Sequence, residues 1–155
     1  MKITTEITQN YEGIEPDIAG LERLVRYVCE SFGLAEVTVS IGVVDDVEIG
    51  VFNERFLSHE GPTDCISFDL SDGQGPEEPR VFDLIVNGQL AQREAAQRGH
   101  SGEAELALYV THGLLHQLGY DDATAEQAEA MHGREDEILQ HLGYGFVYNT
   151  GPRSR

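Results

Sequence analysis

The sequence carries little positive charge. Ten lysines and arginines stand against 28 aspartates and glutamates, Lys2 is the only lysine, and the formal net charge is -18. Long-range attraction to nucleic acid comes from basic groups that displace counterions, so this composition opposes it. Because the acidic residues are dispersed along the chain, the favoured interpretation is a solvated acidic surface, such as one adapted to a salty cytoplasm.

Cysteine and long apolar segments are also scarce. The two cysteines, Cys29 and Cys65, stand in apolar stretches, which predicts small buried side chains and not a disulfide or a metal pair. No apolar run approaches membrane length, and no basic, apolar leader opens the chain. We therefore expect a cytoplasmic protein without a membrane partner. Its 155 residues favour one domain that buries about two-thirds of its unfolded surface.

No internal repeat, phosphate-cradling glycine loop or Ser-His-Asp spacing is present. The informative stretch runs from Thr111 to Asp122. His112 and His116 stand four apart, which on an α-helix places both imidazoles on one face, able to share a metal ion. The helix is supported by apolar residues at three- and four-residue steps, namely Leu106, Tyr109, Val110, Leu114 and Leu118.

Gly119 supplies the left-handed residue that commonly ends a helix and reverses the chain. This reversal can bring Asp121 or Asp122 to the metal. Two imidazoles and one carboxylate, with a fourth position for water, are the ligand set of an open, catalytic zinc-type site. A histidine pair at this spacing is more often an ordinary surface or core pair, but the glycine and the carboxylate that follow strengthen the metal interpretation.

The same frame is similar to the elongated zinc motif of metzincin-type proteases, in which the third ligand also follows a glycine turn. Those enzymes have a glutamate directly after the first histidine as general base, and Gly113 occupies that position here. Peptide hydrolysis by the standard mechanism is therefore not expected.

A second informative stretch, residues 53–68, runs from a short helix through a Gly-Pro turn into a strand. Together with the histidine stretch it resembles the YbeY family of bacterial rRNA maturation factors, described as metal-dependent endoribonucleases. The first family motif is matched by Asn53, Phe56, Pro62, Thr63, Asp64, Ser67 and Phe68. The second is matched by His112, Gly113, Leu115, His116, Gly119, Tyr120 and Asp121, and a strand between the two motifs by Asp83, Leu84, Ile85 and Asn87. The resemblance spans residues 37–139 in one order.

The resemblance implies an α+β fold in one domain over residues 1–155, with a flexible tail from about residue 145. A small mixed sheet of about four strands would pack with about five helices, and a zincin-like metal helix would lie in a cleft. The implied activity is endoribonucleolytic, in rRNA processing and ribosome maturation. It implies one divalent metal ion per chain, with zinc expected, held by His112, His116 and Asp122. The implied partners are rRNA or pre-rRNA and the small ribosomal subunit or an associated protein.

Two positions depart from the family pattern. The third metal histidine is Asp122 here, and its carboxylate remains an ordinary zinc ligand that would also tolerate manganese or magnesium better. The family arginine four residues after Asn53, thought to engage phosphate, is Leu57. Its nearest replacements are Arg55 and His59, and a histidine cannot copy the planar fork of donors that arginine offers to phosphate.

His59 and Asp64 are the candidate catalytic residues. His59 is either a substitute for the missing arginine, and a possible base for an RNA 2'-hydroxyl, or a loop histidine without a role. For Asp64, and likewise Thr63, bracing the turn through backbone N-H groups is favoured over catalysis. Two other functions stay open: a metal-stabilised ribosome-assembly factor that does not cut RNA, and a metalloprotease, which Gly113 opposes.

The other segments predict the elements around these motifs. We expect strands within residues 1–13, at an edge, and over 37–43, 65–68 and 81–86. Helices are expected from Asp17 to Gly33, from Asp45 or Asp46 to about Phe56, over 90–97, after Ser101 and over 124–141. On the last of these helices, His132 and His141 are predicted to be surface residues.

Overall fold

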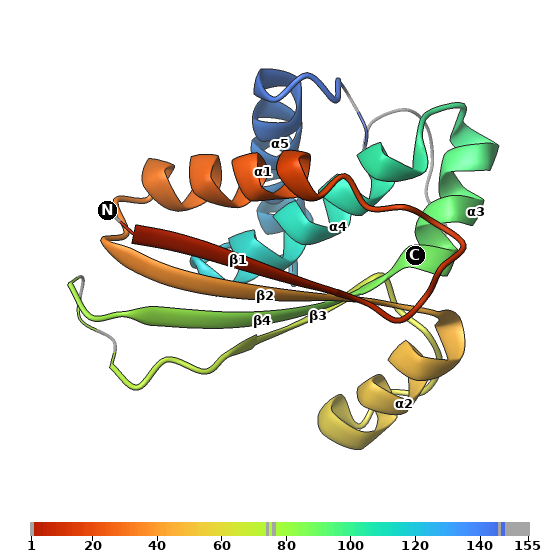
Figure 1. Ribbon diagram of the computed structural model, residues 1–155, viewed down its shortest axis with the longest axis horizontal. Helices are drawn as coiled ribbons and strands as arrows, with labels where there is room; N and C mark the ends of the chain where they lie inside the picture. The colour runs from red at the N-terminus through yellow and green to blue at the C-terminus, as the bar shows by residue number, and fades with distance from the viewer. Residues whose placement is uncertain (1, 74, 76, 146, 148–155) are drawn as a thin grey trace.

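The computed structural model describes residues 2–73, 75, 77–145 and 147 of the chain. Within them, four strands form one mixed sheet in the order β1-β2-β4-β3, and five helices pack around it (Figure 1). The strands are β1 (Lys2–Gln9), β2 (Glu36–Val44), β3 (Cys65–Asp69) and β4 (Arg80–Asn87). The helices are α1 (Ile18–Ser31), α2 (Asp46–Leu57), α3 (Gly88–Arg98), α4 (Gly102–Gln117) and α5 (Ala125–His141). The expected α+β fold with a four-stranded mixed sheet is confirmed.

The sheet combines two parallel pairings with one antiparallel pairing. β1 pairs with β2 and β2 with β4 in parallel, whereas β3 runs antiparallel to β4. Along β2, Val37, Val39, Ile41 and Val43 are all buried, and Thr38 and Ser40 between them are half-buried. This alternation separates an inner, apolar face of the sheet from an outer face. As expected, the first strand lies at an edge.

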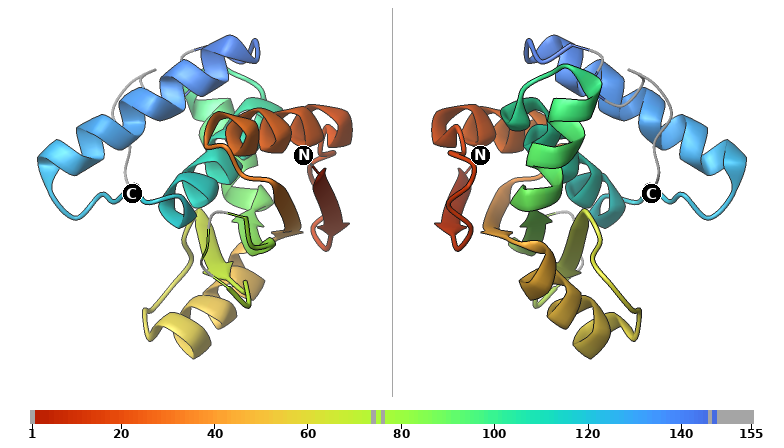
Figure 2. Two further views of the ribbon diagram at one scale, coloured as in Figure 1. Left: turned by 90° about the vertical axis from the view of Figure 1, so that its left-hand side faces the viewer. Right: turned by 90° about the vertical axis from the view of Figure 1, so that its right-hand side faces the viewer.

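The helices form unequal layers on the two faces of the sheet. α1 and α4 lie on the inner face, α5 packs on α4, and α2 lies on the opposite face (Figures 1 and 2). The main core fills the space between the inner face and these helices. A smaller cluster of Val44, Ile49, Ile66 and Ile85 lies on the outer face, where α2 covers one end of the sheet.

Each helix begins at a side chain that accepts a hydrogen bond from a backbone N-H of its first turn. These N-cap residues are Asp17, Asp45, Asn87, Ser101 and Thr124. Such caps satisfy N-H groups that have no partner within the helix. They fix where α4 and α5 start, and therefore which residues of each helix reach the functional site.

No helix in the described part of the chain is both long and apolar enough to cross a membrane. The tail predicted to be flexible from about residue 145 falls mainly on residues 146 and 148–155, which lie outside the described residues. Cys29 is fully buried in α1, as expected, and burial raises the pKa of its thiol to about 12.

Candidate metal centre

Helix α4 holds the two histidines predicted to bind metal. It contacts β3, β4, α1, α3 and α5, so its rotation about its own axis is fixed by packing on several sides. His112 and His116 lie in its last two turns, with side chains that are 12% and 30% exposed. Both imidazoles are therefore held by a buried helix and remain accessible at one side.

The structure brings His112, His116 and Asp122 together. Nε2 of His112 lies 3.2 Å from Nε2 of His116. Oδ2 of Asp122 lies 3.6 Å from the first nitrogen and 3.7 Å from the second. A tetrahedral zinc ion with bonds of about 2.05 Å needs donor atoms about 3.3 Å apart, so the triangle is close to a formed three-ligand site. The donor set fits a divalent metal and leaves a fourth position for water or substrate.

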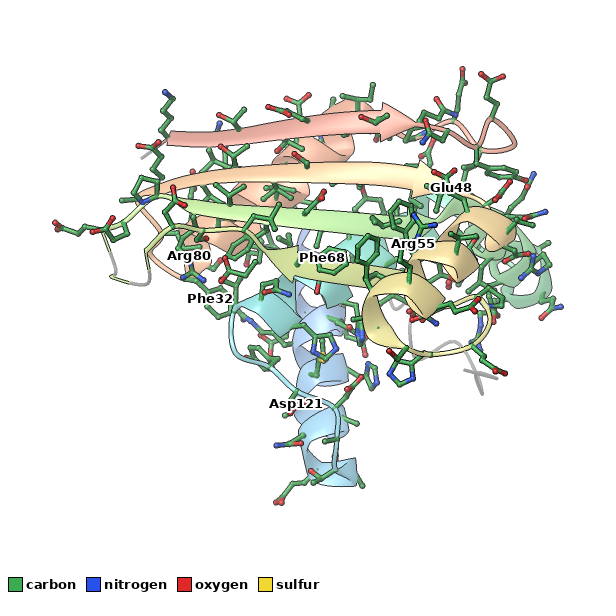
Figure 3. All side chains as sticks on the ribbon, turned by 90° about the horizontal axis from the view of Figure 1, so that it is seen from below. Phe32, Glu48, Arg55, Phe68, Arg80 and Asp121 are labelled. Carbon is green, nitrogen blue, oxygen red and sulfur yellow. The ribbon has the colours of Figure 1, made fainter. Side chains whose placement is uncertain are left out.

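Gly119 explains how Asp122 reaches the histidines. Its φ of 106° is a left-handed conformation, and the N-H of Tyr120 donates to the carbonyl of Leu115 at 2.9 Å. These features end α4 and turn the chain back over its last turn, as the sequence predicts. Asp121, labelled in Figure 3, marks the loop that carries the third ligand. The side chain of Asp122 is 41% exposed, so the site is open on this side.

Glu135 on α5 fixes the orientation of the His112 ring. Its Oε2 lies 2.6 Å from Nδ1 of His112, and its side chain is fully buried. Burial raises the pKa of Glu135, but hydrogen bonds from His112 and His132 outweigh this effect and leave the pKa below its ordinary value. The ionised carboxylate can only accept, so Nδ1 of His112 is the donor and Nε2 is the nitrogen that faces His116 and Asp122. This is the usual support for a metal-binding histidine.

Gly113 allows α4 to lie close against the sheet. A Cβ atom at this position would be 2.7 Å from Sγ of Cys65 on β3 and 3.0 Å from Cδ2 of Leu84 on β4. A side chain here would require the side chains of Cys65 and Leu84, or the strands that carry them, to shift. The position where a metalloprotease has its glutamate is therefore filled by the sheet itself, which gives a physical reason for the absence of that base. Cys65 is half-buried, and burial raises the pKa of its thiol to about 12.

The ligand triangle lies in a cleft of about 640 Å³ between the α2–β3 loop and helices α4 and α5. Its described lining residues are Asn53, Leu57, His59, Glu60, Pro62, Thr63, Asp64, Cys65, Ser67, His112, Gly113, His116, Asp122 and His132. The two family motifs, distant in sequence, thus form opposite walls of one cavity. Neither lysine nor arginine occurs among these described residues.

Hydrogen bonds hold the wall formed by the α2–β3 loop. The buried side chain of Asn53 donates to the carbonyl of Gly61 at 2.9 Å. Oδ1 of Asp64 accepts from the N-H of Cys65 at 2.7 Å, and Nδ2 of Asn87 donates to the carbonyl of Thr63 at 3.1 Å. The contacts of Asp64 are those of a residue that braces the turn, and its carboxylate also lines the cleft. Its suggested catalytic role stays a prediction.

His59 lies in the same cleft, on an exposed part of the loop after α2. Ser58 ends α2 with a φ of 56°, and the N-H of His59 donates to the carbonyl of Asn53 at 3.3 Å. Leu57, where the family arginine was expected, also lines the cleft and is 43% exposed. Both residues line the same cleft as His112 and His116, and the suggestion that His59 substitutes for the missing arginine stays a prediction.

The prediction that His132 lies on the surface is wrong. Its side chain is 16% exposed, its Nδ1 lies 2.7 Å from Oε1 of Glu135, and it lines the cleft. Sequence reasoning did not place His132 or Glu135 at the site. Glu135 gave a usable signal, because it shares the apolar face of α5 with Met131, Ile138 and Leu139, and a carboxylate on a buried face requires a partner. His132 stands one turn before it. His141, in contrast, is exposed as expected.

A family model described as Endoribonuclease YbeY matches residues 5–143. The chain belongs to the YbeY family. Endoribonuclease YbeY of Macrococcus caseolyticus is 39% identical over 129 residues, which cover 79% of this chain and 84% of the relative. Endoribonuclease YbeY of Bacillus licheniformis is 33% identical over 153 residues, which cover 92% of this chain and 97% of the relative. A solution structure of a Thermotoga maritima protein shares the fold, with a TM-score of 0.57 at 24% identity over 97% of this chain and 100% of that one.

Membership of the YbeY family confirms the resemblance deduced from the two motifs. Two groups of described side chains could hold a metal ion. These groups are His112, His116 and Asp122, and His112, His132 and Glu135. In the second group the short distances from both rings to Glu135 are those of hydrogen bonds. The first group contains the three side chains that the sequence predicts to bind metal.

Proposed function

We propose that this YbeY family member is a metal-dependent endoribonuclease that acts in rRNA processing and ribosome maturation, in the cytoplasm. The observation that carries the proposal is the triangle of His112, His116 and Asp122 in a cleft whose other wall is the second family motif. The names of the curated relatives support RNA as the substrate. A protease is not favoured, because Gly113 leaves no room for the required glutamate.

In this proposal His112, His116 and Asp122 hold one divalent ion per chain, and zinc suits two imidazoles and a carboxylate. A bound ion of this type polarises a phosphoryl oxygen and lowers the pKa of a bound water. The protein residues have separate tasks. Glu135 keeps the proton of His112 on Nδ1, and Asn53 and Asp64 hold the opposite wall in place. His59 can contact the substrate from the loop.

The charge of the chain bears on how RNA reaches the cleft. The net charge of -18 repels a polyanion, and the described lining of the cleft contains no lysine or arginine. Nonspecific RNA affinity arises from such residues. We therefore propose that a protein on or near the small ribosomal subunit brings the substrate to the enzyme. Efficient cleavage of free RNA at moderate salt would contradict this part of the proposal.

The test combines metal analysis with RNA cleavage. The metal content of the wild type, His116→Ala and Asp122→Ala is measured by mass spectrometry, with His141→Ala as control because His141 is exposed and remote from the cleft. We expect about one ion per chain in the wild type and the control, and loss of metal and of rRNA cleavage in the other two. A wild type that keeps its ion but leaves rRNA and small subunits uncut would identify a metal-stabilised assembly factor instead.

A further inference from the structure

His132 lines the cleft but belongs to neither family motif. It lies on α5, one turn before Glu135, and its side chain is 16% exposed. The two oxygens of Glu135 are divided between two rings: Oε2 lies 2.6 Å from Nδ1 of His112, and Oε1 lies 2.7 Å from Nδ1 of His132. One buried carboxylate thus holds a metal-binding histidine and a second histidine beside it.

The bond to Glu135 determines the chemistry that His132 offers. An ionised carboxylate is an acceptor only, so Nδ1 of His132 donates this hydrogen bond, and Nε2 is the other nitrogen of the ring. A neutral ring with its proton on Nδ1 accepts a hydrogen bond at Nε2. His112 has the same tautomer for the same reason, and the two ring planes are nearly parallel, at 14°.

The distances separate His132 from the ligands themselves. Its ring centroid is 6.1 Å from that of His112. A ring nitrogen of His132 lies within 4.8 Å of donor atoms of His112 and Glu135. His132 is not part of the group formed by His112, His116 and Asp122. His132 is thus beside the ligand triangle and not a corner of it. A side chain in this position can contact a group that occupies the open side of the site.

The cleft needs an acceptor at this place. Attack on a phosphodiester starts from a hydroxyl group, and HExxH metalloproteases orient their own attacking water with the glutamate that follows the first histidine. Here that residue is Gly113, which has no room for a side chain. The carboxylate of Asp64 accepts from the backbone of its own turn, and His59 is exposed on a loop. His132 is instead fixed to a helix by a buried partner, which is the better support for precise orientation.

We infer that His132 is a further catalytic residue: its Nε2 accepts a hydrogen bond from the hydroxyl that attacks the phosphate, and it thereby orients that hydroxyl. This inference rests on the endoribonuclease function proposed above. The hydroxyl belongs either to a water molecule or to the RNA 2' position, and the two share the chemistry that His132 recognises. Glu135 acts through His132 as a positioning residue.

Two substitutions distinguish the role of Nδ1, which donates to Glu135, from the proposed role of Nε2. In His132→Asn, the side-chain amide N-H can still donate to Glu135, but nothing replaces Nε2. In His132→Gln, the longer amide can place its oxygen near the former Nε2 position, whereas the bond to Glu135 is lost. His141→Asn on the same helix is the matched control. Urea unfolding of each variant tests whether the protein is folded, and its metal content tests whether zinc is bound.

The kinetic test uses the zinc-loaded protein and a labelled rRNA fragment that the wild type cleaves. We expect His132→Asn to lower kcat about 100-fold, the lower end of the usual range for a group that assists proton movement, with KM and metal content unchanged. His132→Gln should recover part of kcat, and His141→Asn should match the wild type. A kcat for His132→Asn within about twofold of the wild type would overturn the inference, and so would loss of the metal, which would make His132 a ligand.

Nitrogen NMR of the histidine side chains provides a readout that does not depend on activity. We expect the Nδ1-H tautomer for His132 in the wild type and a changed signal in Glu135→Gln. A ring protonated on Nε2 alone would be a donor toward the cleft and would contradict the inference. Once the cleavage position is mapped, a substrate with a single 2'-deoxy nucleotide there identifies the hydroxyl: retained cleavage indicates water, and lost cleavage indicates the 2' group. Absence of wild-type cleavage would instead reject the function proposed above.

Discussion

Oε2 of Glu135 lies 2.6 Å from Nδ1 of His112, across the interface between α5 and α4. The carboxylate is fully buried, and the same side chain also accepts from His132. An ionised, buried acceptor at this distance fixes both the tautomer and the orientation of His112. The predicted metal site therefore includes a supporting residue 23 positions further along the chain.

Replacement of Glu135 by glutamine tests this dependence. The amide oxygen can accept from one histidine, but the amide nitrogen cannot accept from the other, so one ring loses its support. We expect zinc affinity to fall about 10- to 100-fold, as is usual for loss of such a partner. Competition with a chromophoric chelator measures it. Glu137→Gln on the exposed side of α5 is the control, and equal affinities for both variants would contradict the role of Glu135.

Gly113→Ala tests the close contact between α4 and the sheet. The new methyl group would meet Sγ of Cys65 at 2.7 Å, so the Cys65 side chain would have to move or α4 and β3 would have to separate. Overpacking of this kind costs about 1 to 3 kcal/mol of unfolding free energy, which outweighs the better helix propensity of alanine. Urea unfolding gives the difference.

The matched control is Gly133→Ala, in the middle of α5, where an added Cβ would meet nothing within 4 Å. This variant should be more stable than the wild type by about 0.5 to 1 kcal/mol. The double variant Gly113→Ala, Cys65→Ala should recover part of the loss. If Gly113→Ala were as stable as Gly133→Ala, the packing argument against a side chain at position 113 would be wrong.

Leu57→Arg places a cation at the position of the missing family arginine. Leu57 lines the cleft and is 43% exposed, so the guanidinium can reach a phosphate. We expect a several-fold lower KM for RNA and an increase of about one in the slope of log affinity against log salt. Val47→Arg on the same helix adds equal charge at a position that is 76% exposed and does not line the cleft. Equal effects of the two variants would mean that net charge alone is responsible.

Asp46 connects the cleft wall to α3 and gives a pH-dependent contribution to stability. Its carboxylate accepts from Arg93 at 2.6 Å and from Nδ2 of Asn87 at 2.8 Å, and Asn87 also holds the carbonyl of Thr63. The hydrogen bond from Arg93 is the main cause that lowers the pKa of Asp46 from its ordinary value of 3.8. A lowered folded pKa means that this stabilisation is present above the unfolded pKa and is lost as pH falls through the folded pKa.

Asp46→Asn should therefore be less stable than the wild type at pH 7, and the difference should shrink as the pH falls below about 4. Urea unfolding at a series of pH values measures this. Asp72→Asn, which removes one charge from an exposed loop residue, should show no such convergence. A difference between Asp46→Asn and the wild type that stays constant down to pH 2 would exclude the ionic part of the interaction.

Much of the molecule was predictable because its signals are local. Apolar spacing and caps such as Asp45, Ser101 and Thr124 predicted the helices, and alternating apolar residues predicted β2. His112 and His116 stand one helical turn apart, and Gly119 reverses the chain after them. This spacing predicted that an aspartate after Gly119 meets both histidines, because the whole segment is about ten residues long. The choice of Asp122 over Asp121 came from the family resemblance.

What tertiary structure alone decided is which residues from other elements meet this helix. The packing of α5 on α4 places His132 and Glu135 beside His112. The periodicity of each helix predicts its apolar face but not the angle or the register at which the two helices pack. The contact of Gly113 with Cys65 likewise depends on the packing of α4 on β3. The sequence by itself predicted that His112, His116 and one of the two aspartates after Gly119 lie together, because they are neighbours along the chain. Packing between distant segments placed Glu135 against His112 and placed His132 in the same cleft.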